Sequence, residues 1–226
     1  MPLKSNRAGK SPARSGFTLV EMLTVLSIIA IMTGLGVAAF RGGSNGDGTS
    51  GAANAASSVF GQARAEAIMR RTCAAVIVDS DTSNTTSTTL YRRMMAVYLD
   101  PVANVWVQAS SWVTLPGNTY IDPKYSNPFG KLAPAVNGST AAYAYYAFDA
   151  TGQAYLLPSS APGFKSNTTT TAAGQLVVSP GRMSGTTFLE RDTHSRYGFY
   201  LFPLGRVAFF QDVADDLNSP PANPLQ

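Results

Sequence analysis

The stretch that decides the fold is residues 17–40, which read FTLVEMLTVLSIIAIMTGLGVAAF. These 24 residues contain one charge, Glu21, and as a helix they would span about 36 Å, enough to cross a bilayer with some tilt. The preceding residues 1–16 contain no acidic residue and four basic ones: Lys4, Arg7, Lys10 and Arg14. Excess positive charge holds its side of a membrane helix in the cytoplasm. The sequence therefore predicts one membrane span, with the chain after Phe40 translocated.

An ordinary secretory signal also begins basic and then turns apolar, so it is the first alternative. Its apolar core is only about 7–15 residues long, which is shorter than the run in this chain. No small-x-small cleavage site closes the run, and Gly16 stands before it, where a signal peptidase would not cut. The pattern therefore favours a retained membrane helix.

Glu21 is the anomaly in the apolar run, because a carboxylate among lipid tails costs on the order of 3 kcal/mol and needs a partner. A cut between Gly16 and Phe17 would create such a partner. The new α-amino group of Phe17 would be a cation at about the depth of Glu21, available to a neighbouring copy in a bundle of helices.

The specific match lies in residues 10–36, which read KSPARSGFTLVEMLTVLSIIAIMTGLG. They resemble the processing site and membrane helix of type IV pilins and type II secretion pseudopilins. The resemblance implies that a prepilin peptidase cuts after Gly16 and methylates Phe17. It also implies that Glu21 pairs with the terminal amine of an adjacent subunit and sets the register of the filament.

The same resemblance implies partners and a location. The partners are the prepilin peptidase, other pilin or pseudopilin subunits and an inner-membrane assembly platform, and no cofactor is implied. The location is the inner (cytoplasmic) membrane, with a single pass and the head in the periplasm or at the cell exterior. After processing, the subunit would be part of a filament.

Residues 41–51 read RGGSNGDGTSG and contain five glycines. Glycine is unfavourable inside a helix, so this segment is predicted to be a flexible hinge or break. Related proteins usually continue one long helix into the head, and the glycines are a departure from that pattern.

A second helix is predicted over residues 52–71, because apolar residues recur there at spacings of three and four. This stripe consists of Ala56, Val59, Phe60, Ala63 and Ala67. The opposite side carries Arg64, Glu66 and Arg70, and Glu66 and Arg70 stand in a favourable i,i+4 pair. The stripe is expected to pack against a sheet.

After residue 71 the chain changes to short runs rich in β-branched and aromatic residues, divided by Gly, Pro, Asn and Ser, which is typical of antiparallel strands. The predicted strands are residues 73–79, 89–99, 105–114, 143–149, 154–157, 175–179, 186–190, 197–202 and 206–210. Two Thr-rich stretches, 81–89 and 166–173, lack apolar residues for a core and are expected as exposed loops.

The predicted fold class is α+β and, by the resemblance, pilin-like. An N-terminal transmembrane helix is followed by a short helix packed on an antiparallel β-sheet. The globular head is expected to cover residues 52–217. Residues 218–226 contain three prolines and are expected as an extended tail.

A narrower resemblance comes from residues 62–71, QARAEAIMRR, which run directly into the strand CAAVIVD. This junction resembles H-type minor pseudopilins and related minor pilins. Two later segments, residues 148–152 (FDATG) and 202–207 (FPLGRV), resemble the glycine turns of the same proteins. The resemblance implies a minor subunit of a type II secretion pseudopilus or a type IV pilus-like filament, which is not an enzyme.

His194 is the only histidine in the chain, and with Asp192 and Ser195 it raises the alternative of a membrane-anchored exported enzyme. Residues that are adjacent in sequence do not by themselves form a catalytic triad, so a polar loop is the favoured interpretation. The enzyme hypothesis predicts activity that survives deletion of the membrane helix.

Asp212, Asp215 and Asp216 cluster near the C-terminus but lack the spacing of a calcium-binding loop. A solvated acidic turn is favoured, no metal site is predicted, and cation binding there is left open. Cys73 is the only cysteine, which excludes an internal disulfide. It is interpreted as a small buried residue of a strand.

The net charge of +4 suggests a nucleic-acid partner, but four of the 17 basic residues lie in the leader. The remaining 13 balance the 13 acidic residues. A minor pilin that binds duplex DNA during uptake is the remaining alternative, and salt-sensitive binding by the head would reveal it. The candidate contacts are Arg92, Arg93, Arg191, Arg196 and Arg206.

Overall fold

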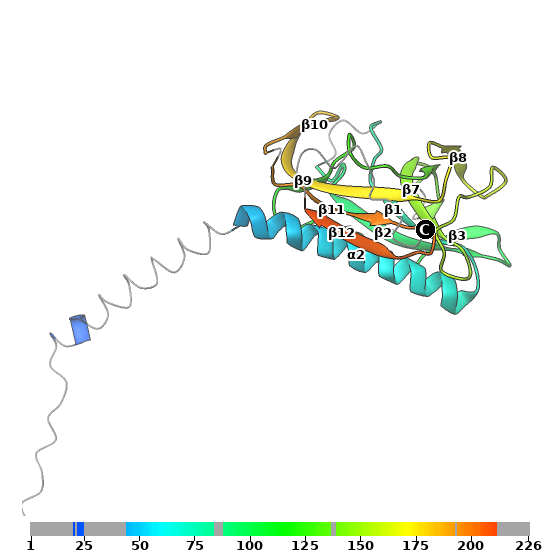
Figure 1. Cartoon of the computed structure of the whole chain (residues 1–226), viewed down its shortest axis with the longest axis horizontal. Helices are drawn as coiled ribbons and strands as arrows, with labels where there is room; N and C mark the ends of the chain where they lie inside the picture. The colour runs from blue at the N-terminus through cyan, green and yellow to red at the C-terminus, as the bar shows by residue number, and fades with distance from the viewer. Residues whose placement is uncertain are drawn as a thin grey trace, which may run out of the picture. The chain divides into compact units, whose positions relative to one another are not determined.

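A computed structural model of the chain describes residues 20, 22–24, 44–83, 88–136, 139–192 and 194–211 (Figure 1). The chain divides into two compact units, residues 1–43 and 44–226. Within the first unit the described residues are helical, and the Thr24 hydroxyl donates to the Val20 carbonyl at 2.9 Å. The predicted leader and most of the predicted membrane helix lie outside the described residues. Among those that are described, no helix combines the length and apolar character needed to cross a membrane.

Helix α2 (Ser44–Arg70) opens the second unit and carries the predicted apolar stripe. All five stripe residues are buried: Ala56, Val59, Phe60, Ala63 and Ala67. The predicted ion pair is also present, because Arg70 Nε lies 2.6 Å from Glu66 Oε2. The periodicity of the sequence therefore predicted correctly which side of the helix faces the core.

The prediction of a hinge over residues 41–51 is wrong for residues 44–51, which are helical. Packing explains why the glycines do not interrupt the helix. Thr49 is buried, and ideal Cβ positions on Gly48 and Gly51 would lie 4.0 Å from Thr119 and Pro116. Tertiary contact with the β5 region thus outweighs the poor helix propensity of these residues. Residues 41–43 lie outside the described residues.

The first sheet is entirely antiparallel, with strand order β3-β2-β1-β7-β6-β8 and β4 paired to β2. Its strands are β1 (Ala74–Val78), β2 (Arg93–Asp100), β3 (Val105–Gln108), β4 (Val113–Thr114), β6 (Gly130–Leu132), β7 (Tyr143–Phe148) and β8 (Phe164–Asn167). The central strand β1 reads AAVIV, and all five of its residues are buried. An unbroken apolar run is what a strand covered on both faces requires.

The second sheet has strand order β10-β9-β11-β12, with β5 paired to β9, and is also antiparallel. Its strands are β5 (Thr119–Ile121), β9 (Gly174–Ser184), β10 (Thr187–Glu190), β11 (Tyr197–Leu201) and β12 (Val207–Gln211). The long strand β9 pairs with three neighbours along its length, so it organises this sheet.

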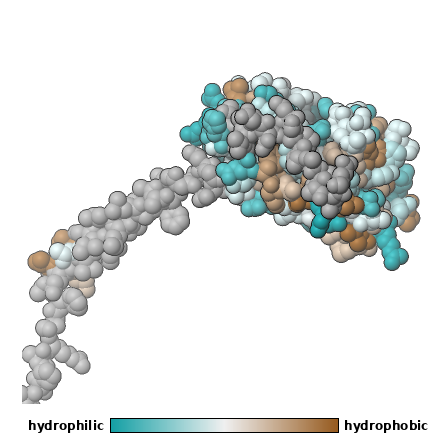
Figure 2. Space-filling model, viewed as in Figure 1, coloured by the Kyte–Doolittle hydropathy of each residue, from teal (hydrophilic) through white to brown (hydrophobic). Residues whose placement is uncertain are grey.

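Helix α2 runs along one side of both sheets (Figure 1). Phe60 of α2 is 1% exposed and joins them, since its ring lies 5.0 Å from that of Tyr146 on β7 and 4.9 Å from that of Phe199 on β11. Aromatic rings at these distances attract one another in addition to burying apolar area. On the visible face of the head, hydrophobic residues are interspersed with hydrophilic ones (Figure 2).

The predicted α+β fold with an antiparallel sheet is confirmed. The predicted strand at residues 154–157 is wrong, because only an isolated bridge from Ala154 to Phe148 forms there. Three strands were missed, namely β5, β6 and β8. They have three or four residues each, too few for an alternating pattern to stand out. Cys73 is half-buried and immediately precedes β1.

Candidate functional site

The predicted processing and assembly residues Gly16, Phe17 and Glu21 lie outside the described residues, and their roles stay predictions. The same holds for the acidic cluster of Asp212, Asp215 and Asp216. Among the described residues, no group of three or more His, Cys, Asp or Glu is placed to hold a metal ion.

The two glycine turns singled out in the sequence meet at Arg64 of α2. We call this contact the Arg64 junction, formed by Arg64, Gly152, Leu204 and Gly205. The Arg64 guanidinium donates from Nε to the Gly152 carbonyl at 2.9 Å and from Nη2 to the Leu204 carbonyl at 3.4 Å. Arg64 was predicted to lie on the outer side of the helix, but it is half-buried because it bridges these turns.

Both glycines are required by the geometry of the Arg64 junction. Gly205 has a φ of 72°, and Gly152 has a φ of 80°. A Cβ on Gly205 would overlap the carbonyl oxygen of Gly152. The amide of Ala154 also donates to the Pro203 carbonyl at 2.8 Å, which ties the two turns together. Only the fold shows that segments about 50 residues apart form one structure.

The predicted DNA contacts Arg92 and Arg93 make internal contacts. Arg93 Nε lies 2.7 Å from Asp79 Oδ2, and its guanidinium lies 4.5 Å from the centre of the Trp112 ring. Arg92 donates from Nη2 to the Gly117 carbonyl at 2.7 Å. These guanidinium groups already have partners within the head, which reduces what they offer to a duplex.

Arg196 is the most deeply buried of the predicted DNA contacts, with 3% of its surface exposed. It forms a bidentate pair with Glu190, in which Nη2 lies 2.7 Å from Oε2 and Nε contacts Oε1. The guanidinium also lies 4.2 Å from the centre of the Tyr125 ring. Paired arginine and glutamate side chains of this kind hold a loop in place.

The remaining candidates, Arg191 and Arg206, are exposed but lie on different parts of the head. Arg191 directly follows β10, whereas Arg206 lies in the turn before β12. The structure therefore does not bring the five arginines together into one basic surface. Duplex binding by these residues stays a prediction.

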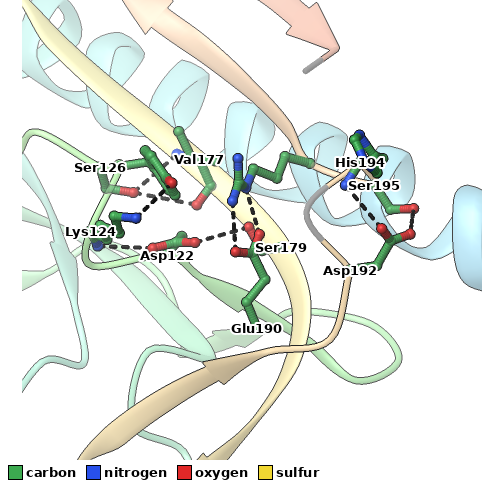
Figure 3. A network of polar contacts seen from close by, with 11 residues as sticks. Asp122, Lys124, Ser126, Val177, Ser179, Glu190, Asp192, His194 and Ser195 are labelled. Carbon is green, nitrogen blue, oxygen red and sulfur yellow. Dashed lines mark hydrogen bonds and ion pairs between the residues drawn. The ribbon is translucent and has the colours of Figure 1, made fainter. Parts of the chain in front are cut away.

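The segment containing Asp192, His194 and Ser195 is a polar turn in the structure (Figure 3). The Asp192 carboxylate accepts hydrogen bonds from the Ser195 hydroxyl and from the His194 backbone amide, the latter at 2.9 Å. The hydrogen bond from Ser195, followed by the one from His194, lowers the pKa of Asp192. Among the described contacts none joins the His194 ring to the Ser195 hydroxyl, although a catalytic triad needs that bond.

A buried carboxylate that sequence reasoning missed directly follows β5. Asp122 is 2% exposed, accepts from the Ser179 hydroxyl at 3.1 Å and accepts from the Lys124 amide at 2.8 Å (Figure 3). Burial raises the pKa of Asp122, against the opposing effect of these two hydrogen bonds. Its Asp-Pro-Lys sequence looks like an ordinary turn, so nothing local signals the burial.

Comparison with known proteins identifies a motif near the N-terminus. Residues 11–37 match the family model described as the prokaryotic N-terminal methylation motif. Among solved structures, the chain is similar to the minor pseudopilin EpsH from the type 2 secretion system of Vibrio cholerae. The two share 14% identity over 70% of this chain and 94% of that chain, with a TM-score of 0.39. No curated protein matches the chain.

The head is an α+β domain in which a long helix precedes two antiparallel sheets. Ahead of it, residues 11–37 carry the prokaryotic N-terminal methylation motif.

Proposed function

We propose that the chain is a minor subunit of a type II secretion pseudopilus or a type IV pilus-like filament. The observation that carries the proposal is the match of residues 11–37 to the methylation motif. That range contains Gly16, Phe17 and Glu21, the residues that processing and assembly require. The proposed work of the protein is assembly rather than catalysis.

The proposed sequence of events begins in the inner membrane. The basic residues of the leader hold the N-terminus in the cytoplasm while the head is translocated. Prepilin peptidase cuts after Gly16 and methylates the new amino group of Phe17. An inner-membrane assembly platform then moves the subunit into a filament.

Register in the filament is proposed to depend on Glu21. An unpaired carboxylate in a bundle of apolar helices costs on the order of 3 kcal/mol, and a neighbouring amino group removes that cost. The pairing of Glu21 with the Phe17 amine of the next subunit therefore favours one register over its alternatives.

The geometry of the head supports an assembly role in two ways. The residues that suggested a hydrolase contact one another as a turn, with Ser195 donating directly to Asp192. Phe60 of α2 packs against both sheets, so the helix that follows the N-terminal segment is part of the core of the head.

The test is intact mass and N-terminal sequencing of the full chain isolated from native membranes. The expected chain begins at N-methylated Phe17 and lacks residues 1–16. An uncut N-terminus, or a cut beyond Phe40, contradicts the proposal.

A matched pair of variants tests the role of Glu21. Glu21→Gln is expected to be processed normally but to be depleted from sheared, pelleted filaments. Glu66→Gln is the control, because it also removes one glutamate, but from an ion pair on the surface of the head. Equal incorporation of the two variants would show that Glu21 does not set the register.

A further inference from the structure

A polar groove lies at the end of the head where the chain enters it. It has a volume of about 640 Å³ and lies between α2, β5 and the β9–β10 hairpin. Figure 1 shows the β9–β10 hairpin at the same end of the head as the first turns drawn for α2. Its lining includes Gly48, Asn118, Arg182, Glu190 and Arg191. Sites for small ligands have volumes of roughly 300–1,000 Å³, so the groove has room for a lipid headgroup.

The lining of the groove carries an excess of positive charge. Arg182 and Arg191 are both exposed, and the Arg191 amide donates to the Pro180 carbonyl at 2.9 Å, which holds their two strands together. Among the lining residues Glu190 is the one acid, and its carboxylate is engaged by Arg196. Two arginine side chains of the groove therefore have no opposing carboxylate within it.

The charges around the groove offset this excess only in part. Asp192 follows Arg191 and attracts it, but Arg182 faces no acid among the lining residues except Glu190, which is paired with Arg196. Arg92 donates to the Gly117 carbonyl of the lining at 2.7 Å but does not itself line the groove. Guanidinium groups bind phosphate oxygens with paired, charge-assisted hydrogen bonds. The chemistry of the groove is that of a phosphate site.

The position of the groove in the chain suggests the source of the phosphate. Gly48 lies eight residues after Phe40, the last residue of the predicted membrane span. Eight residues reach at most about 28 Å even when fully extended, so the groove stays near the membrane surface while the chain is anchored. Anionic headgroups at that surface attract arginine side chains.

We propose that the groove lined by Arg182 and Arg191 binds the phosphate of an anionic phospholipid headgroup while the subunit is stored in the membrane. This inference rests on the proposed function, because it requires an anchored subunit. A bound headgroup would orient the head against the membrane, and extraction into a filament would release it.

The test uses the full chain purified in a neutral detergent, with retained lipids counted by native mass spectrometry. Phosphatidylglycerol is the anionic probe, and phosphatidylcholine is the zwitterionic one. Each arginine near an anionic surface contributes a factor of about five to binding, so the double variant Arg182→Gln/Arg191→Gln should bind phosphatidylglycerol about thirtyfold more weakly. The single variants should each lose about fivefold.

The matched control is Arg71→Gln/Arg206→Gln, which also removes two exposed arginines but leaves the groove intact. It should retain phosphatidylglycerol like the unaltered chain. Equal retention by the two double variants, or equal retention of phosphatidylcholine and phosphatidylglycerol, overturns the proposal. The unfolding midpoint of each variant verifies that the head remains folded.

Two further arms distinguish other sources of phosphate. Displacement of phosphatidylglycerol by an equal concentration of inorganic phosphate would show a free-anion site and overturn the lipid proposal. Binding of duplex DNA is measured for the same variants. If Arg182 and Arg191 are needed for DNA binding but not for lipid binding, the lipid proposal is overturned as well. The same mass spectra report the N-terminus. A chain that begins at Phe17 but binds no lipid refutes this inference alone, whereas an uncut chain refutes the proposed function.

Discussion

Substitution of Gly205 by alanine tests the geometry of the Arg64 junction. Gly205 has a φ of 72°, and a Cβ there would overlap the Gly152 carbonyl oxygen and lie 3.0 Å from Arg64 Nε. The control is Gly117→Ala. Gly117 also has a positive φ, 62°, but a Cβ there would meet nothing within 4 Å. The two variants share the cost of an unfavourable backbone and differ in the clash.

The expected losses of unfolding free energy follow from the unfavourable backbone conformation and from the clash. An L-residue in the left-handed region costs about 1–2 kcal/mol, which is the full effect expected for Gly117→Ala. Gly205→Ala has the same cost and must also displace the Gly152 turn, which adds about 1–3 kcal/mol. The movement would further weaken the Arg64–Gly152 hydrogen bond. The expected loss of unfolding free energy for Gly205→Ala is about 3–5 kcal/mol.

The assay is urea unfolding of a soluble head that begins at Ser44, monitored by the fluorescence of Trp106 and Trp112. The free energy of unfolding is compared between the two variants and the unaltered head. If the two substitutions cost the same within about 0.5 kcal/mol, the close approach of the turns does not contribute to stability and the reasoning is refuted.

Two other substitutions test the core and the buried carboxylate. Phe60→Ala should lower the free energy of unfolding by about 3–5 kcal/mol, because Phe60 fills the space between both sheets, whereas Phe209→Ala should cost much less, since Phe209 is 48% exposed. Similar losses in urea unfolding would contradict this account of the core. Asp122 has a raised pKa in the folded head, so the folded state binds its proton more tightly than the unfolded state. The free energy of unfolding should therefore fall as the pH rises from the ordinary Asp value of about 3.9 to the folded-state pKa. The free energy of unfolding is measured from pH 3 to 7 for both proteins, and Asp122→Asn should lack this decrease. The same pH dependence in both proteins would show that Asp122 does not cause it.

Several elements followed from local patterns because their physical causes are local. The apolar stripe of α2 has a period that matches the helix, so its buried side was predictable before any contact was known. The Glu66–Arg70 pair depends only on a spacing of four residues. The buried strand β1 was predictable because AAVIV is an unbroken run of apolar residues.

Other features depend on which segments meet, and local patterns do not carry that information. The glycine-rich residues 44–51 are helical because they pack against the β5 region. The short strand β5 forms because β9 offers it a partner. Arg196 looked like a free cation in the sequence, but the fold places Glu190 against it.

The sequence by itself determined the match to the N-terminal methylation motif, because the motif and the apolar run are contiguous and their chemistry is local. Only the tertiary structure decided the Arg64 junction, the buried Asp122 and the arginine-lined groove. Each of these joins side chains or turns from distant segments. Their energies depend on close packing and on exclusion of water, which arise only when the sheets and α2 come together.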